Sequence, residues 1–430
     1  MTKQTSATAM DRVNKNLQKR YRAEKRFRFY GVLSIAFGLF CLAFLFTNII
    51  GKGMRGFFYH YVPFTITLDA NTLGITDSSD TNQILGADYR LLINNAVYTV
   101  FSANGRSEKR DARSLIATDA AGYQLQKLLL DDIGLLNATV TIDAPVDDKV
   151  DYYLKRYTGE AGSPGTEYFN ERQLGMIVTL QQQSLFDKQF NTRFFTTGDS
   201  SQSEEAGILS AIMGSLFLLL VTFLLSFPIG IAAAVYLEEY APKNKWTDLI
   251  EININNLAAV PSIIFGLLGL AVFLGLFGLP RSTPLVGGFV LTLMTLPTII
   301  ISSRAAIKAV PPSIREAAFG IGASKMQVIV HHVVPLAMPG MLTGTIIGLA
   351  QALGESAPLL MIGMAAFIPE VPQGVTDPAT ALPMQIFQWF RNADAGFNEK
   401  ASAAILVLII FLVMMNALAV WARKRLERRW

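Results

Sequence analysis

One acidic residue lies within a long apolar stretch of the C-terminal half of the chain. Glu355 belongs to a run that is mostly apolar from Leu336 to Phe367. An ionised side chain at membrane depth costs about 2.5 kcal/mol or more, so Glu355 must face protein or water rather than lipid. We expect a role in a solute pathway or in gating, and a structural hydrogen bond between helices is the alternative.

Small residues precede Glu355 at helical spacing. Three of four glycines recur every four residues, which places them on a narrow stripe where a neighbouring backbone can pack closely. The glycines are Gly340, Gly344, Gly348 and Gly354. Gln351 continues the spacing towards Glu355, so we predict that the glycine face and the polar face of this helix coincide, with both side chains on the pathway.

A second polar stripe lies upstream in another apolar stretch. Its hydroxyl residues share one side of a helix at spacings of three and four, and a proline among them frees a backbone carbonyl. They are Thr292, Thr295, Thr298 and Ser302, with Pro297 between them. Such a stripe either holds helices together or contacts a solute, and we place Thr295, Thr298 and Ser302 on the pathway. Arg304 projects away from the stripe, where it either extends to water or attracts an anion.

Between these stripes lies a loop with helix-start and helix-stop residues. Ser313 to Glu316 and Ser324 to Gln327 each have the capping-box spacing, and Pro311-Pro312 suits a helix entry. Gly320 and Gly322 suit the end of one helix and the turn into the next. The loop therefore predicts a helix, a glycine turn and a second helix that stops at Pro335. Ala317 and Ala318 keep one side of the first helix small, which favours the docking of another surface.

The elements that position these residues are membrane helices. The chain has 430 residues, of which 51% are hydrophobic, and a mean hydropathy of +0.36. A span needs about 20 apolar residues, and six segments meet that length: Gly31–Ile50, Leu209–Tyr236, Leu257–Gly278, Leu285–Ile307, Leu336–Phe367 and Ala401–Trp421. Pro261 and several glycines predict a bent, closely packed third span.

Charge predicts the orientation of these spans. Residues 1–29 and the tail 423–430 are rich in Lys and Arg, and such flanks stay in the cytoplasm. Both termini are therefore expected inside, together with the loop 308–335. The basic N-terminus and its apolar run are interpreted as a retained anchor, residues 30–50, because no small-residue cleavage site follows.

Residues 51–206 are expected to form a soluble domain outside the cytoplasm, ahead of a five-helix core at 207–422. The segment 51–207 carries 20 acidic and 14 basic residues, opposite in sign to the termini. Alternating patterns predict strands at Phe64–Leu68, Ala96–Phe101 and Ala138–Ile142, whereas Tyr123–Leu130 and Val150–Tyr157 favour helices. We expect a small α+β domain that ends in a linker at Gly198–Ala206.

Several kinds of chemistry have no pattern in this chain. Cys41 is the only cysteine and stands in an apolar run, the three histidines are scattered, and no phosphate-binding P-loop motif occurs. The pairs Asp131–Asp132 and Asp147–Asp148 are interpreted as solvated surface rather than metal ligands. We therefore expect no cofactor, no metal site and no catalytic activity.

The loop and the helices around it resemble a known family. Glu316-Ala317-Ala318, Gly322 and Pro335 resemble the EAA loop of permease subunits in binding-protein-dependent ABC importers, although His332 and Val334 depart from its usual pattern. The runs Val260–Leu267, Gly207–Leu216 and Gly354–Leu360 are similar to PstA-type permeases of the phosphate importer. The resemblance covers residues 207–367 well. Gln351 departs from it, because members often have an arginine there.

This resemblance implies a fold and a function. The fold is an all-α polytopic membrane protein with six transmembrane helices of the ABC importer permease type, here with an inserted α+β domain. The function is transport of inorganic phosphate across the bacterial inner membrane, with ATP hydrolysed by separate subunits. The implied partners are a PstC-type permease, a PstB-type ATPase dimer and a periplasmic PstS-type phosphate-binding protein. The implied coupling residues are Ser313, Arg315, Glu316, Ala317, Ala318, Gly322 and Lys325.

Two other functions remain open at this point. The first is a permease of the same class for another oxyanion such as sulfate or molybdate, which the run Gly354–Leu360 alone argues against. The second is a membrane-anchored periplasmic sensor or enzyme that acts through residues 51–207. The absence of a catalytic triad, metal cluster or nucleotide-binding motif argues against the second.

Overall fold

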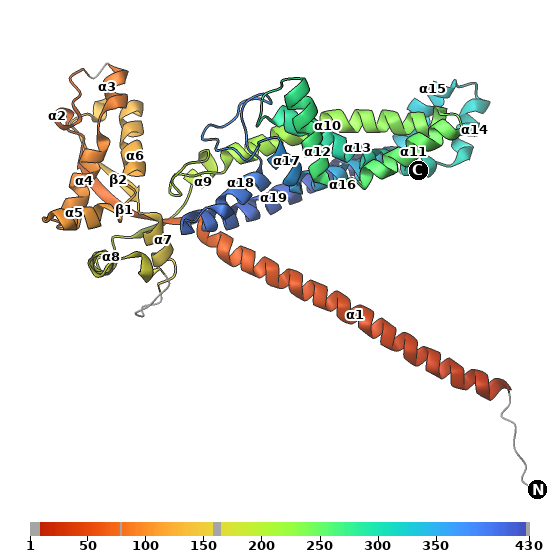
Figure 1. Ribbon diagram of the computed structural model, residues 1–430, viewed down its shortest axis with the longest axis horizontal. Coiled ribbons are helices and arrows are strands. Elements are labelled where there is room, and N and C mark those ends of the chain that lie inside the picture. Colours follow the sequence, from red (N-terminus) through yellow and green to blue (C-terminus); the bar gives the residue numbers. More distant parts are fainter. Residues whose placement is uncertain (1–8, 78–79, 158–164, 427–430) are drawn as a thin grey trace, which may run out of the picture. The chain divides into compact units, whose positions relative to one another are not determined.

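The computed structural model describes residues 9–77, 80–157 and 165–426 (Figure 1). The chain divides into two units, residues 1–52 and 53–430. The outermost parts of the two basic termini, residues 1–8 and 427–430, lie outside the described residues. Each unit is described by itself.

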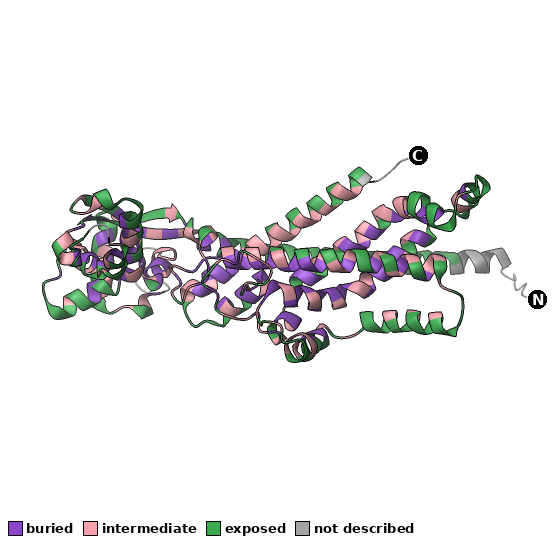
Figure 2. Cartoon of the chain, turned by 90° about the horizontal axis from the view of Figure 1, so that it is seen from above, coloured by how far each residue is buried: buried purple, intermediate pink, exposed green. Residues whose placement is uncertain are grey.

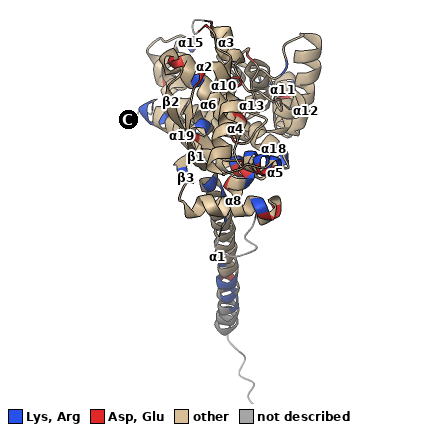
Figure 3. Cartoon of the chain, turned by 90° about the vertical axis from the view of Figure 1, so that its left-hand side faces the viewer, with Lys and Arg blue, Asp and Glu red and all other residues tan. Residues whose placement is uncertain are grey.

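The first unit consists of most of α1 (Ala9–Gly56). Its candidate membrane span is Lys19–Gly56, which contains the predicted anchor and begins earlier. Large apolar side chains such as Phe37 and Phe40 are exposed within this unit. Lys and Arg gather on the N-terminal part of α1 (Figure 3), as expected of a helix that leaves a membrane at that end.

The inserted domain, residues 57–206, combines a small sheet with short helices. Its antiparallel strands have the order β2-β1-β3, with Phe64 of β1 opposite Ile142 of β2. The strands are β1 (Phe58–Thr67), β2 (Thr139–Pro145) and β3 (Asp187–Phe190). The helices are α2 (Ala70–Leu73), α3 (Thr81–Gly86), α4 (Tyr89–Val100), α5 (Arg106–Arg113), α6 (Thr118–Asp131), η1 (Ile133–Leu135), α7 (Asp148–Leu154), η2 (Thr166–Tyr168), α8 (Glu171–Gln182) and α9 (Arg193–Thr196).

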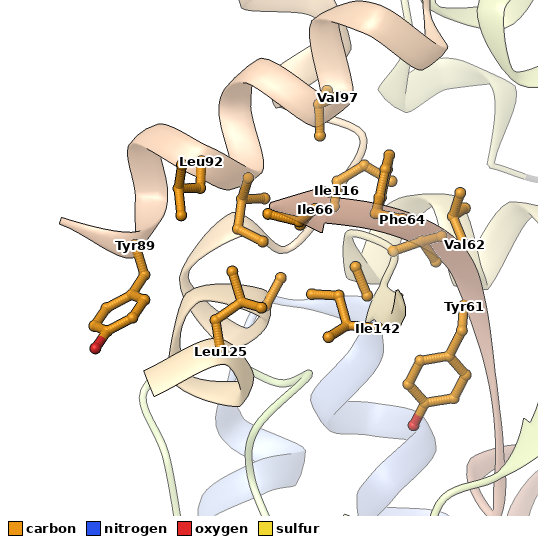
Figure 4. Packing of buried hydrophobic residues seen from close by; sticks show 14 of the residues in the cluster. Tyr61, Val62, Phe64, Ile66, Tyr89, Leu92, Val97, Ile116, Leu125 and Ile142 are labelled. Atoms are coloured by element: carbon orange, nitrogen blue, oxygen red, sulfur yellow. The ribbon is translucent and has the colours of Figure 1, made fainter. Parts of the chain in front are cut away.

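The core of this domain lies between β1 and the helices α4 and α6. Figure 4 shows Phe64 and Ile66 of β1 near Leu92 and Val97 of α4, with Leu125 of α6 below them. Phe64 and Leu125 are fully buried. Burial of an aromatic or leucine side chain contributes roughly 1.5–3 kcal/mol, so this contact holds the helices on the sheet.

One predicted strand of the domain is wrong. Residues 96–100 belong to α4, whose start is capped by Asp88 accepting from the backbone N–H of Leu91. The buried residues of α4 are Tyr89, Leu92, Ile93 and Val97. That spacing is helical. The helical pattern of the whole segment therefore determines its structure, rather than the short alternation of residues at Ala96–Phe101. The predicted helix at Tyr123–Leu130 is confirmed in α6. The one at Val150–Tyr157 is confirmed in α7 as far as Leu154, where α7 ends.

The remaining helices form an apolar bundle. α10 (Leu209–Val235) and α16 (Val334–Gly354) both pack on α13 (Pro284–Lys308), and all three contain many buried residues. Figure 2 shows buried residues gathered along the inside of the long helices. The other elements are η3 (Tyr236–Tyr240), α11 (Lys245–Ala258), α12 (Ser262–Gly269), η4 (Leu270–Leu276), α14 (Pro312–Gly320), α15 (Lys325–Val328), η5 (Ile329–Val333), α17 (Ala357–Met361), α18 (Leu382–Arg391) and α19 (Ala395–Leu426). In the described residues, five helices are long and apolar enough to cross a membrane, and a bent pair would raise the number to six.

The bent pair replaces the third predicted span. α11 and α12 meet at an angle of 100°, and Pro261 lies at the break with extended backbone angles. Proline disfavours a helical conformation in the preceding residue and has no N–H to donate. The predicted bend is therefore confirmed, but Leu257–Gly278 is not one continuous helix.

The fifth span begins and ends earlier than the predicted Leu336–Phe367, because the candidate span is Lys325–Gly354. α16 ends at Gly354, Glu355 is extended, and the short helix α17 begins at Ala357. Pro358 in the first turn of α17 suits a new helix start and not a helix interior. The prediction that Glu355 lies in the middle of a helix is therefore wrong: it lies in a break between two helices.

Candidate functional site

The loop between α13 and α16 folds as a helix, a glycine turn and a second helix, as predicted, with two corrections. The second helix does not stop at Pro335, because the helix that begins at Lys325 continues through η5 and α16 to Gly354. α14 and α15 are joined through Gly322, whose φ of +86° is unfavourable for residues with a side chain. Ser324 caps α15, and Gln327 accepts from the Ser324 backbone N–H at 2.8 Å. The predicted capping box at Ser313 is wrong, because α14 begins at Pro312 and Ser313 lies inside it.

The exposed side of this loop carries both charge and apolar surface. Glu316 and Ala317 are exposed, whereas Ala318 is buried against the bundle. Ala318 is thus a packing residue, which corrects its prediction as part of a docking surface. Phe319 is 49% exposed and Ile321 is 83% exposed. Neither was predicted, although two large apolar residues beside a glycine turn indicate a contact surface.

Arg315 points into the protein rather than out of the loop. Its guanidinium donates to Glu239 Oε1 at 2.8 and 3.1 Å. It also donates to the backbone carbonyl oxygens of Val310 at 2.7 Å and Ile307 at 3.0 Å. Arg315 therefore ties α14 to the end of α13 and to η3, which the sequence did not reveal.

Arg304 is likewise committed to carboxylates. Its Nη1 lies 2.8 Å from Glu251 of α11, and its Nε lies 3.4 Å from Glu238 of η3. Lys308 lies 3.7 Å from the same Glu238. Because two acidic groups face Arg304, the predicted attraction of a free anion to this side chain has no support in the geometry.

The hydroxyl stripe of α13 faces α16. Thr295 is 1% exposed and donates to the Thr292 carbonyl at 3.2 Å. Ser302 donates to the Thr298 carbonyl at 2.7 Å, and a Cβ added to Gly344 would overlap the Ser302 hydroxyl. Thr295 and Ser302 therefore serve close packing between α13 and α16, one of the two roles that the pattern left open. Thr298 is only partly buried.

The glycines of α16 and the polar residues at its C-terminal end differ in burial. Gly344 and Gly348 are buried against α13, but Gln351 is exposed and Glu355 is half-buried. The stripe is therefore closely packed at these glycines and uncovered at Gln351. Nearer its N-terminus, α13 packs on α10 through Gly288 and Val221.

Two helix breaks adjoin each other in the bundle. α12 packs on α17, and a Cβ added to Gly266 would lie 2.7 Å from Pro358 Cα. Both short helices begin at a break, one at Pro261 and one at Glu355. At membrane depth, irregular backbone is tolerated only where protein or water satisfies it. The sequence predicted the bend at Pro261, but it revealed neither the break at Glu355 nor the packing of α12 on α17.

A carboxylate group in the inserted domain corrects another prediction. Asp147, Asp148 and Glu204 bring ligand atoms within 4.8 Å of one another, and Asp148 is buried rather than solvated. Burial, and then the neighbouring Asp148 and Glu204, raise the pKa of Asp147 to about 7. Asp147 accepts from the Lys149 N–H and Glu204 from the Asp148 N–H, both at 3.1 Å. These bonds are structural caps, and nothing else points to a bound ion.

Comparison with known proteins gives the class of the chain. Residues 226–430 match the family of binding-protein-dependent transport system inner membrane components, and residues 14–161 match a domain of unknown function, DUF3333. The chain is 30% identical over 247 residues to the probable ABC transporter permease protein YqgI of Bacillus subtilis (strain 168), covering 54% of this chain and 83% of that protein. It is 28% identical over 222 residues to the phosphate transport system permease protein PstA of Haemophilus influenzae, covering 52% and 77%.

A solved structure of the MetNI methionine ABC transporter, in an inward-facing conformation, matches with a TM-score of 0.41 and 21% identity. The match covers 51% of this chain and 96% of that chain. A TM-score this low does not by itself establish a shared fold.

The sequence relatives are sufficient for the assignment. The chain belongs to the family of inner-membrane permease subunits of binding-protein-dependent ABC transporters, as a PstA-type member. It is a mostly helical, multi-pass protein of the inner membrane.

Proposed function

We propose that this chain is one of two homologous permease subunits that carry inorganic phosphate across the inner membrane. The partner permease is of the PstC type. ATP is hydrolysed by a separate cytoplasmic ATPase dimer, and a periplasmic binding protein delivers the anion. Both termini and the loop 308–335 lie in the cytoplasm, and the inserted domain lies outside it.

The observation that carries this proposal is the exposed surface of α14 and the glycine turn. Glu316 and Phe319 of α14, with Ile321 directly after it, offer a charge and two large apolar side chains. Arg315 holds α14 against the bundle through its hydrogen bond to Glu239. A motion of a docked ATPase subunit would therefore move the ends of the spans instead of only bending the loop.

The pathway is proposed to run past Gln351 and Glu355. Gln351 is exposed in this single chain, so a partner subunit or water must cover it inside a membrane. The adjoining breaks at Pro261 and Glu355 bring irregular backbone to the same region. Thr298 contributes one further partly exposed hydroxyl. Gln351 carries no charge, so the anion would be bound by backbone N–H groups and by the partner permease.

Phosphate is proposed because relatives such as the Haemophilus influenzae PstA are phosphate permeases by name. The test is radiolabelled phosphate uptake at low micromolar concentration, in cells with and without the chain, challenged by excess sulfate or molybdate. Uptake that depends on the chain and is reduced only by unlabelled phosphate supports the substrate. If sulfate or molybdate competes instead, the chain is a permease for that oxyanion.

The docking role has its own test. Glu316→Lys combined with Gly322→Asp reverses the exposed charge and forces a side chain into the positive φ of the turn. We expect normal insertion in the membrane but no uptake and no ATP hydrolysis stimulated by the binding protein. The control is Gly320→Ala, at a helical position with open space around it. Normal uptake by the double variant would falsify the docking role.

A further inference from the structure

Glu238, Glu239 and Tyr240 follow one another at the cytoplasmic end of α10, in η3. Each contacts a different segment: the end of α13, α14 and α15. Glu238 contacts Arg304 and Lys308 near the end of α13. Glu239 binds Arg315 of α14 through two hydrogen bonds.

Tyr240 completes the series on α15. The Lys325 ammonium group lies 4.7 Å from the centre of the Tyr240 ring. The Tyr240 hydroxyl lies 3.4 Å from Met326 Sδ. Lys325 and Met326 are both exposed, so this is a surface contact. It joins α15 to the same end of α10 that holds α13 and α14.

Helix geometry explains how adjacent residues reach three different partners. The three residues belong to the π-helical turn η3, and successive residues of a helix point in different directions around its axis. Such π-helical turns are frequent at functional sites. The loop therefore wraps around the end of α10.

The charges in this joint are largely withdrawn from water. The side chains of Glu238 and Glu239 are 17% and 13% exposed, and that of Arg315 is 21% exposed. Removing one partner of such a pair leaves the other partly buried and unpaired, which is more costly than loss of a surface pair. The contacts are thus strong enough to transmit movement between the loop and α10.

We propose that Glu238, Glu239 and Tyr240 are positioning residues that transmit the movement of the loop to the second span. This rests on the proposed docking of an ATPase to the loop. The loop surface would receive the movement, and η3 would transmit it to α10, which packs along α13 in the centre of the bundle. None of the three residues belongs to the loop motif.

The experiment uses the full chain, co-expressed with its partner permease and ATPase subunits and reconstituted with the binding protein. The variants are Glu239→Ala, Arg315→Ala, the double variant, and the exchange Glu239→Arg with Arg315→Glu. The matched control is Asp248→Asn, an exposed acidic residue of α11 with no ion pair among the described side chains. Three quantities are measured for each variant: binding of the ATPase subunits to the chain, the rate of ATP hydrolysis, and the kinetics of uptake.

We expect the Glu239→Ala variant still to bind the ATPase subunits, because the exposed surface of α14 stays in place. Its maximal uptake rate should fall about tenfold, as for the loss of a typical coupling free energy, with the KM unchanged. ATP hydrolysis should become independent of the binding protein. The double variant should be no worse than either single variant, and the charge exchange should recover part of the rate.

Two outcomes would overturn the inference. One is an unchanged uptake rate in Glu239→Ala and in the charge exchange. The other is loss of ATPase binding in Glu239→Ala in step with uptake, because Glu239 would then only keep the docking surface folded. A wild-type chain that retains no ATPase overturns the proposed function itself, which separates the two failures.

Discussion

The two aspartate pairs of the inserted domain differ in burial. Asp131, at the end of α6, is exposed. Asp147 lies close to Asp148 and Glu204, and burial is the main reason that its pKa is raised to about 7. Burial also raises the pKa of Glu204. The two aspartate pairs look alike in sequence, so only their surroundings distinguish them.

The raised pKa of Asp147 predicts a pH dependence of stability. Between about pH 4, where an unfolded aspartate ionises, and pH 7, the folded chain keeps a proton that the unfolded chain has lost. The contribution of Asp147 to stability therefore decreases as the pH rises to about 7 and is constant above it. Asp147→Asn keeps the cap on α7 and cannot ionise. Relative to wild type, this variant should gain stability from pH 5 to pH 8.

Hydrogen exchange of α7 in the detergent-purified chain measures this effect at both pH values. Asp131→Asn is the control and should follow the wild type. Parallel behaviour of Asp147→Asn and wild type at both pH values would contradict the buried, protonated state.

At the scale of elements, the packing of α13 on α16 requires a glycine at some positions along α16 and not at others. A Cβ on Gly344 would overlap Ser302, and one on Gly340 would lie 2.6 Å from Ala306 Cβ. At Gly348 the nearest atoms are 3.7 Å away, and Gly354 has open space. Gly340, Gly344 and Gly348 look equivalent in the sequence but are not equivalent in the structure.

This difference predicts that alanine substitutions at Gly344 and Gly348 destabilise the protein to different extents. Gly344→Ala should lower the free energy of unfolding by about 1–3 kcal/mol, because overpacking forces two helices apart. Gly348→Ala should be neutral or stabilising by up to about 1 kcal/mol, because alanine restricts the unfolded chain. Thermal unfolding in detergent measures both. Equal melting temperatures for the two variants would disprove the close contact at Gly344.

At the scale of the molecule, buried charges join the inserted domain to the last helix. Lys155 follows α7, and its Nζ lies 3.1 Å from Glu399 Oε2 of α19. Arg156 pairs with the same carboxylate, and Asp151 pairs with both Lys155 and His60. The segment Gly198–Ala206 was predicted to be a linker. It is irregular as expected, but Asp199 and Ser203 are buried in it, so it does not act as a free tether.

This junction predicts that one neutralising substitution loosens the domain. Glu399→Gln leaves Lys155 with Asp151 alone and removes the carboxylate that pairs with Arg156. This should cost about 3 kcal/mol, as for other broken buried pairs. Arg90→Gln breaks the exposed pair with Asp119 and should cost no more than about 1 kcal/mol. Hydrogen exchange of α7 and limited proteolysis of residues 198–206 report the loosening. A Glu399→Gln variant no more labile than Arg90→Gln would refute the junction.

Much of the architecture follows from local patterns in the sequence. Long apolar runs predict the helices α1, α10, α13 and α19, because lipid demands that each backbone bond be satisfied within the segment. Gly322 and Ser324 mark the turn and the start of α15 through their own backbone chemistry. The residues of the EAA pattern likewise identify the family without any contact being known.

The tertiary structure alone determined which polar groups are available for function. Arg304 and Arg315 look like free cations in the sequence, yet each has a carboxylate partner some 50 to 80 residues away in the chain. Ala318 and the hydroxyl stripe are covered by packing, whereas Gln351 is not. Such pairings depend on which helices lie side by side, and sequence spacing within one helix carries no information about its neighbours.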